Sequence, residues 1–294
     1  MRTRHLLLLI LALPAMALRA PDPLVEALRK YQAGDLQGAR ELVDDAVTSA
    51  QHMGNAEAWL LRGFVYKDIY KAKSGGAEGD AARDTALASL YRTITIDKDS
   101  TYRDNAVQAY EFLSRSCYNE AAKALADGTD DRAVTLYDSY RESVLLLDPK
   151  TDLRAREAEF SNALGTLYTK RFNADRTQTQ WFEKATDTYR GVLRIDPENY
   201  GANYNLATLF YNMGVYRIRA LQVEADIITM QQVQEVAREY FQLALPFMLK
   251  AHDMNPGRRE TVLGLEGIYY SLQDEMNSEK FRQLYEGLPP QEDR

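Results

Sequence analysis

The chain has 294 residues, of which 45% are hydrophobic and 27% are charged, a composition typical of a soluble folded protein. The 43 acidic residues outnumber the 36 Lys and Arg residues, so the formal net charge is -7, and no basic stripe is visible. Because nucleic-acid binding needs clustered cations that neutralise phosphates, we expect no nucleic-acid partner.

The first residues have the pattern of a secretory signal peptide. A start with two arginines leads into an apolar run at 6–13, which small residues follow. Ala15 and Ala17 suit a signal peptidase, so we expect a signal peptide at 1–17 and a mature repeat domain at 18–294. The apolar run is shorter than the roughly 20 residues that span a bilayer. An uncleaved anchor is therefore the less favoured alternative, and we expect no membrane span after cleavage.

Cysteine usage bears on the compartment. Cys117 is the single cysteine, so the chain cannot form an internal disulfide. Export without disulfides indicates the bacterial periplasm, with secretion as the alternative. On its predicted helix, Cys117 is better interpreted as a buried structural thiol than as a nucleophile.

Helical hairpins are indicated by small and large residues that recur at a fixed spacing. Near the start, the turn and second helix of one hairpin are marked by Tyr31, Gly34, Ala39 and Val43. The first helix of the next hairpin is marked by the aromatic residue Trp59, by Gly63 four positions on and by Tyr66 three positions later. Its second helix runs from Ala86 through Leu90. The first-helix frame returns at Leu164-Gly165 with Tyr168, at Leu206-Ala207 with Phe210, and at Leu265 with Tyr269.

The second helices carry small residues of their own and end near prolines. Their small and large positions are Ala133 and Tyr137, Ala185 and Tyr189, and Ala244 and Met248. They end at Asp148-Pro149, Asp196-Pro197 and Asn255-Pro256, because proline disfavours helical geometry in the residue before it. Gly214 is predicted to lie in a left-handed turn at the end of a first helix.

These residues resemble the tetratricopeptide repeat family over nearly all of the mature chain. The resemblance implies an all-α fold, a right-handed solenoid of about six antiparallel helical hairpins, with one of them elongated. Ser161 and Asn203 stand where the family has an aromatic residue, and Glu266 stands where it has a small one. A generic helical bundle is the alternative.

Three inserts separate paired helices. Residues 71–82 are predicted to form a flexible loop, and residues 173–180 a shorter polar loop before Trp181. Residues 215–236 keep a helical apolar spacing. The hairpin has roughly 25 residues more than a standard unit, and these residues, shared between its two helices, should lengthen it by roughly 18 Å. Pro246 is expected to kink the second of them. This extension is either an arm that grips a partner or a segment packed on its neighbours.

The family frame also implies which residues face the concave surface. They are Asn162, Thr166, Lys170, Tyr204, Asn205, Thr208, Tyr211 and Asn212. A surface of Asn and Tyr suits a protein or peptide partner, since tyrosine gives contact area with little entropy to lose. The alternative for each residue is an ordinary solvated helix face. The Lys and Asn clamp of chaperone-binding family members is not found at matching positions.

No constellation of residues calls for an enzyme. The three histidines, His5, His52 and His252, are far apart in the sequence, so we expect no metal site, no catalytic residues and no cofactor. Two functions remain. One is a periplasmic scaffold or adaptor that mediates protein-protein interactions in an envelope or secretion assembly. The other is a small-molecule binder for a transport system, with a cavity enclosed by the repeats.

Overall fold

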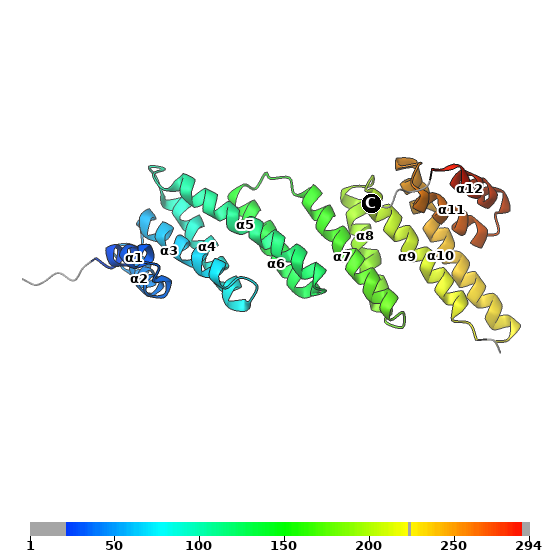
Figure 1. The fold of residues 1–294 in the computed structure, drawn as a ribbon, viewed down its shortest axis with the longest axis horizontal. Coiled ribbons are helices and arrows are strands. Elements are labelled where there is room, and N and C mark those ends of the chain that lie inside the picture. Colours follow the sequence, from blue (N-terminus) through cyan, green and yellow to red (C-terminus); the bar gives the residue numbers. More distant parts are fainter. Residues whose placement is uncertain (1–21, 223–224, 290–294) are drawn as a thin grey trace, which may run out of the picture. The chain divides into compact units, whose positions relative to one another are not determined.

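The computed structural model describes residues 22–222 and 225–289, and within these ranges it contains twelve α-helices and no strand (Figure 1). The helices are α1 Pro23–Gln32, α2 Leu36–Thr48, α3 Ala56–Ala72, α4 Ala77–Ile96, α5 Arg103–Ala126, α6 Asp130–Leu147, α7 Arg154–Ala174, α8 Thr179–Ile195, α9 Tyr200–Arg219, α10 Ile227–Met254, α11 Arg259–Ser271 and α12 Glu275–Gly287. Two compact units divide between Leu113 and Ser114, inside α5.

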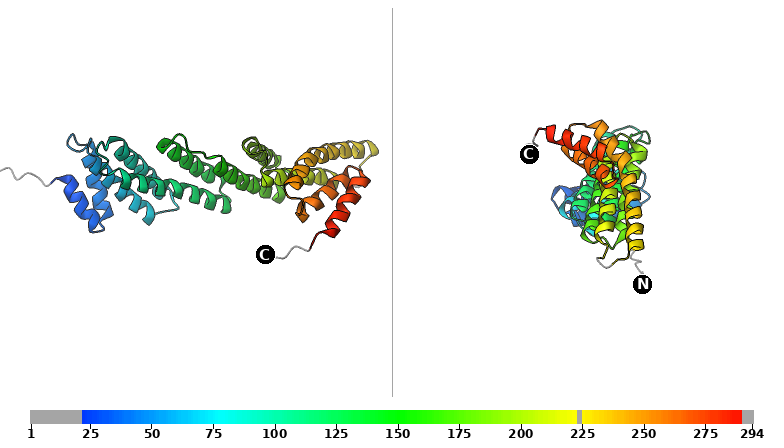
Figure 2. Two further views of the ribbon diagram at one scale, coloured as in Figure 1. Left: turned by 90° about the horizontal axis from the view of Figure 1, so that it is seen from above. Right: turned by 90° about the vertical axis from the view of Figure 1, so that its right-hand side faces the viewer.

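Consecutive helices pair as antiparallel hairpins, which confirms the predicted helical-hairpin repeat. In the first unit α1 packs on α2, α2 on α3 and α3 on α4. In the second unit contacts join α6 to α7 and then every consecutive pair up to α11 and α12, whose orange and red ribbons lie side by side in Figure 2. First helices of successive hairpins also touch, since α7 contacts α9 and α9 contacts α11.

The predicted small positions admit large side chains from the paired helix. A Cβ on Gly63 would lie 2.6 Å from Leu90 Cδ2, and one on Gly165 would lie 2.7 Å from Tyr189 Cε1. These separations are shorter than carbon atoms tolerate, so only glycine permits this approach of the helices. The hairpin register expected from the sequence is therefore correct at both sites.

Local capping residues set many helix starts. Six helices begin after an Asp or Asn whose side chain accepts a hydrogen bond from a backbone N–H of the first turn, at Asp22, Asp35, Asn55, Asn199, Asp226 and Asp274. Three hairpin turns use glycine in the left-handed region, Gly34 at φ 81°, Gly75 at φ 93° and Gly128 at φ 76°.

Gly214 does not form the predicted left-handed turn. It lies inside α9, which continues to Arg219. A Cβ there would meet Phe241 Cε1 at 2.6 Å, so this glycine is needed for close packing of α10. The predicted loop at 71–82 is also shorter than expected, because α4 already begins at Ala77.

The elongated hairpin is α9 with α10. The extra length is not shared evenly: α10 has 28 residues, whereas α9 has 20 and α8 has 17. At 1.5 Å per residue, α10 is about 16 Å longer than α8. Pro246 lies inside α10, and the helix continues on both sides of it.

The expected signal peptide at 1–17 and the cleavage site before Leu18 lie outside the described residues. No helix in the described part of the chain is both long enough and apolar enough to cross a membrane.

Candidate functional site

A groove opens in the second unit between α9 and α11, the first helices of the last two hairpins. It has a volume of about 670 Å³. Four residues of α9 line one wall, namely Tyr204, Thr208, Tyr211 and Asn212. The other wall is α11, with Glu260, Leu263, Glu266 and Tyr270, and Met248 of α10 also lines it. Tyr270 and Leu263 are 77% and 51% exposed, so apolar surface is available to a partner.

Two glycines of α11 allow the groove to form. A Cβ on Gly264 would lie 2.6 Å from Met248 Cε, and one on Gly267 would lie 3.0 Å from the hydroxyl of Tyr211. The ring of Tyr211 packs against that of Phe241, with ring centroids 5.6 Å apart. Tyr211 thus packs against α10 on one side, and its hydroxyl approaches the backbone of α11 at Gly267 on the other.

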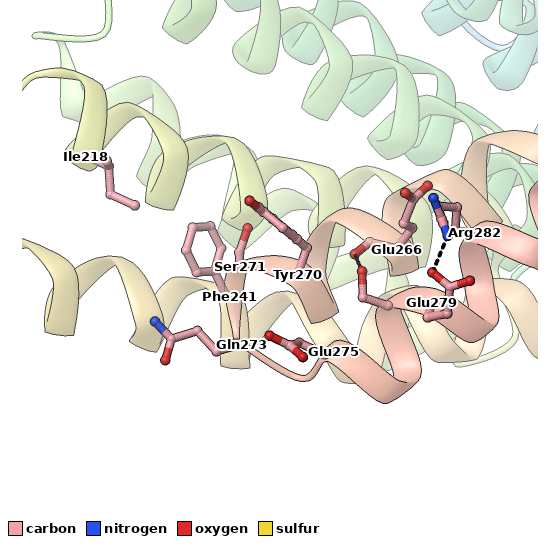
Figure 3. A pocket seen from close by; sticks show the side chains of 10 residues that line it. Ile218, Phe241, Glu266, Tyr270, Ser271, Gln273, Glu275, Glu279 and Arg282 are labelled. Atoms are coloured by element: carbon pink, nitrogen blue, oxygen red, sulfur yellow. Dashed lines mark hydrogen bonds and ion pairs between the residues drawn. The ribbon is translucent and has the colours of Figure 1, made fainter.

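A second, more polar groove of about 1020 Å³ adjoins the first and shares Glu266 and Tyr270 with it (Figure 3). Its other charged residues are Glu275, Glu279 and Arg282 of α12. Arg282 lies 2.5 Å from Glu279, and this ion pair holds the pKa of the Glu279 carboxyl below its usual value. We call the two hollows together the α9–α12 groove.

At the beginning of α9, an arginine is already held between a tyrosine and a glutamate. Arg258 lies over the ring of Tyr200, 5.3 Å from its centroid, and its Nε is 3.4 Å from Glu260. The Tyr200 ring in turn stacks on Tyr204, with centroids 6.1 Å apart. Burial is the main cause that raises the pKa of Tyr200. This end of the groove therefore combines aromatic faces with a carboxylate.

Four of the predicted concave-surface residues, Asn162, Thr166, Lys170 and Asn205, do not line the groove. Asn162 Nδ2 donates to Asn199 Oδ1 at 2.9 Å and so links α7 to the capping residue of α9.

Thr166 and Asn205 both contact the buried hydroxyl of Tyr189. Lys170 is exposed on α7. Asn162, Thr166 and Asn205 therefore have contacts within the repeat. Of the eight predicted residues, four come together at the groove, namely Tyr204, Thr208, Tyr211 and Asn212.

The groove also contains residues that were not predicted from the sequence. Leu263 and Tyr270 occupy the same frame positions in α11 that Tyr204 and Tyr211 occupy in α9. The spacing used for the fifth hairpin would have identified them if it had been continued into the sixth. Asn203, which replaces a family aromatic, is buried and donates to the carbonyls of Pro197 and Asn199 at 3.1 and 2.9 Å.

Residues able to bind a metal are not gathered anywhere in the described part of the chain, where no group of three or more His, Cys, Asp or Glu is suitably placed. Cys117 is fully buried. His52 Nε2 lies 2.8 Å from Asp22, and the ring of His252 packs edge-on against Phe281, 5.4 Å between centroids.

No protein-family model matches the chain, and no curated protein matches it. Among solved structures, a monomeric IFIT1 mutant with Gppp-AAAA is similar at 13% sequence identity and a TM-score of 0.40. The alignment covers 90% of this chain and 59% of that one. A second monomeric IFIT1 mutant, with m7Gppp-AAAA, has 12% identity, a TM-score of 0.39 and the same coverage. This chain thus spans less than two thirds of the length of these structures.

Proposed function

We propose that this protein is an exported scaffold of helical hairpins that binds a segment of a partner protein in the α9–α12 groove. One observation carries the proposal: four residues chosen from the repeat frame, Tyr204, Thr208, Tyr211 and Asn212, line one continuous wall of that groove. Half-buried tyrosines on a rigid helix are the residues that anchor protein interfaces. The opposite wall adds the exposed ring of Tyr270.

The form of the groove favours a peptide over a small molecule. Apolar ligands are usually enclosed in a cavity lined mostly by apolar side chains. Here the hollow is open to solvent, and Glu266, Glu275 and Glu279 line its larger part. The same glutamates argue against RNA, since their charge repels phosphates.

The pattern of residues 1–17 supports export to the periplasm, and we propose that the partner belongs to an envelope or secretion assembly. N-terminal sequencing of the protein recovered from the periplasmic fraction should find Leu18 first. Recovery of intact Met1 from the membrane fraction would contradict the proposal of a cleaved signal peptide.

The far end of the elongated hairpin supports a role for it as a binding arm. Ile227 and Ile228, in the first turn of α10, are 69% and 68% exposed. Val236 and Leu243, further along α10, are 40% and 43% exposed. Surface of this kind on a protruding hairpin is suited to contact with another protein.

The test begins with capture of the partner from envelope extracts by the mature protein, followed by measurement of the affinity of the purified pair. Replacing Tyr204 and Tyr211 with Ala should weaken the complex by roughly 2 kcal/mol or more, or about 30-fold. Tyr285→Ala is the matched control, because Tyr285 is a half-buried tyrosine of α12 outside the groove. Equal affinity of the double variant and the control, with helical content unchanged, would exclude the groove.

The arm is tested separately by shortening it between about Tyr216 and Gln234 by whole helical turns on both sides. Because each hairpin contacts only its neighbours, the fold should be kept. Loss of affinity in the shortened protein is expected if the arm contributes to binding. Unchanged affinity would restrict binding to the groove.

A further inference from the structure

The part of the groove next to α12 has an excess of negative charge. Its charged residues are three glutamates, Glu266, Glu275 and Glu279, and one arginine, Arg282. Arg282 pairs with Glu279, and this pair, together with the charges of Glu286 and Glu266, raises the pKa of its guanidinium. One cation is thus shared among several glutamates, while Glu275 is exposed at the first position of α12. The groove is left with acceptors for a further cation.

The part next to α9 is chemically different. Tyr204, Tyr211 and Leu263 face it, and Met248 lies at its floor. Tyr270 stands on the border of both parts and is 77% exposed. An occupant that fills the whole groove therefore meets apolar and aromatic surface on one side and carboxylates on the other.

The chain itself holds a cation in this way. Arg258 lies over Tyr200 and 3.4 Å from Glu260, at one end of the same groove. A cation over an aromatic ring beside a carboxylate gains from both the ring and the ion pair. Tyr270 with Glu266 or Glu275 offers the same combination of groups to a side chain from outside.

We infer that the groove selects a segment of a partner protein that carries Lys or Arg next to an apolar anchor residue. This inference rests on the proposed function and adds the chemical class of the segment. The apolar anchor enters between α9 and α11, and the basic side chains extend past Tyr270 toward the glutamates of α12. An acidic segment or a phosphorylated one would meet like charge in the same place.

The test uses two labelled synthetic peptides with the same leucines and the same length, one with Lys and one with Glu at every polar position. Binding to the full mature protein is followed by fluorescence anisotropy. The Lys peptide should bind at least about tenfold more tightly than the Glu peptide, and the difference should shrink as salt is added.

Position within the groove is tested by the double variant Glu266→Gln and Glu275→Gln. It should weaken the Lys peptide by about tenfold, the effect of two partly solvated ion pairs. The control is Glu142→Gln with Glu183→Gln, which changes the net charge equally at two exposed glutamates of α6 and α8.

Three outcomes would overturn the inference: no binding of the Lys peptide, equal binding of the two peptides, or equal weakening by the control pair. The proposed function is judged by a different variant. If the glutamine variants bind the Lys peptide normally but Tyr204→Ala with Tyr211→Ala does not, the groove still binds peptides and only its charge selection is wrong.

Discussion

Gly165 provides a direct test of the hairpin packing, because its missing side chain is what admits the ring of Tyr189. A Cβ at this position would lie 2.7 Å from Cε1 and 2.8 Å from Cζ of the ring. Tyr189 is 1% exposed, and its hydroxyl is 3.3 and 3.4 Å from the hydroxyls of Thr166 and Thr169. The ring therefore cannot move aside without losing contacts elsewhere.

The expected magnitude follows from two opposing effects. Gly165→Ala forces an overpacked contact that costs roughly 1–3 kcal/mol. The higher helix propensity of Ala offsets about 1 kcal/mol of this. We expect Gly165→Ala to lower the free energy of unfolding by about 1 kcal/mol. Gly165→Leu, with its larger side chain, should lower it by about 3 kcal/mol.

Gly191 in α8 is the matched control for this variant. A Cβ there would meet only Arg194 Nη2, at 3.7 Å, which is an ordinary contact. Gly191→Ala should therefore stabilise the protein by up to about 1 kcal/mol. Thermal melts measure both variants, with about 2–4 °C expected per kcal/mol. If Gly165→Ala and Gly191→Ala raise the melting temperature alike, the packing deduced at Gly165 is wrong.

Two further predictions concern stability. Arg171 in α7 lies 2.7 Å from Asp130, which is 7% exposed, so Arg171→Gln should lower the free energy of unfolding by about 3 kcal/mol, because it leaves a buried carboxylate without its ion pair. Adding Asp130→Asn should recover part of that loss in urea titrations, and no recovery would contradict a role for the ion pair. For Tyr118, burial and then a hydrogen bond to Glu159 raise the pKa from 10 to about 12. The neutral phenol is favoured in the folded state, so this contribution to stability is complete below pH 10 and is lost as the pH rises to about 12. Melting temperatures measured across that range should fall less steeply for Tyr118→Phe, and identical slopes would refute the assignment.

The hairpin order was predictable because close helix packing requires small residues at fixed spacings to large ones in the sequence. Gly63 and Gly165 could be identified from their spacing to aromatic residues, and each faces the expected helix. Gly214 was misinterpreted because glycine serves both turns and close contacts. The close contact at Gly214 is made by Phe241, which is distant in the sequence and so could not be inferred from the residues around the glycine.

The site was only partly predictable for a related reason. The repeat frame gives the direction of a side chain, so it placed Tyr204 and Tyr211 on the correct face of α9. It cannot give the partner of that side chain within the fold. Asn162, for example, is engaged by Asn199, 37 positions away. The negative charge of the groove comes largely from Glu275 and Glu279 of α12, a second helix, whereas the frame used for the site assigns positions on first helices alone.

The two glycines in the α11 wall of the groove affect how readily its shape can change. Position 267 leaves 3.0 Å between a hypothetical Cβ and the hydroxyl of Tyr211, and position 264 borders the flexible end of Met248. A single methyl group at either place would displace Met248 or Tyr211, and so change the shape of the groove without altering its charge. Homologues that differ only at 264 or 267 would then present the same charges to partners of different shape.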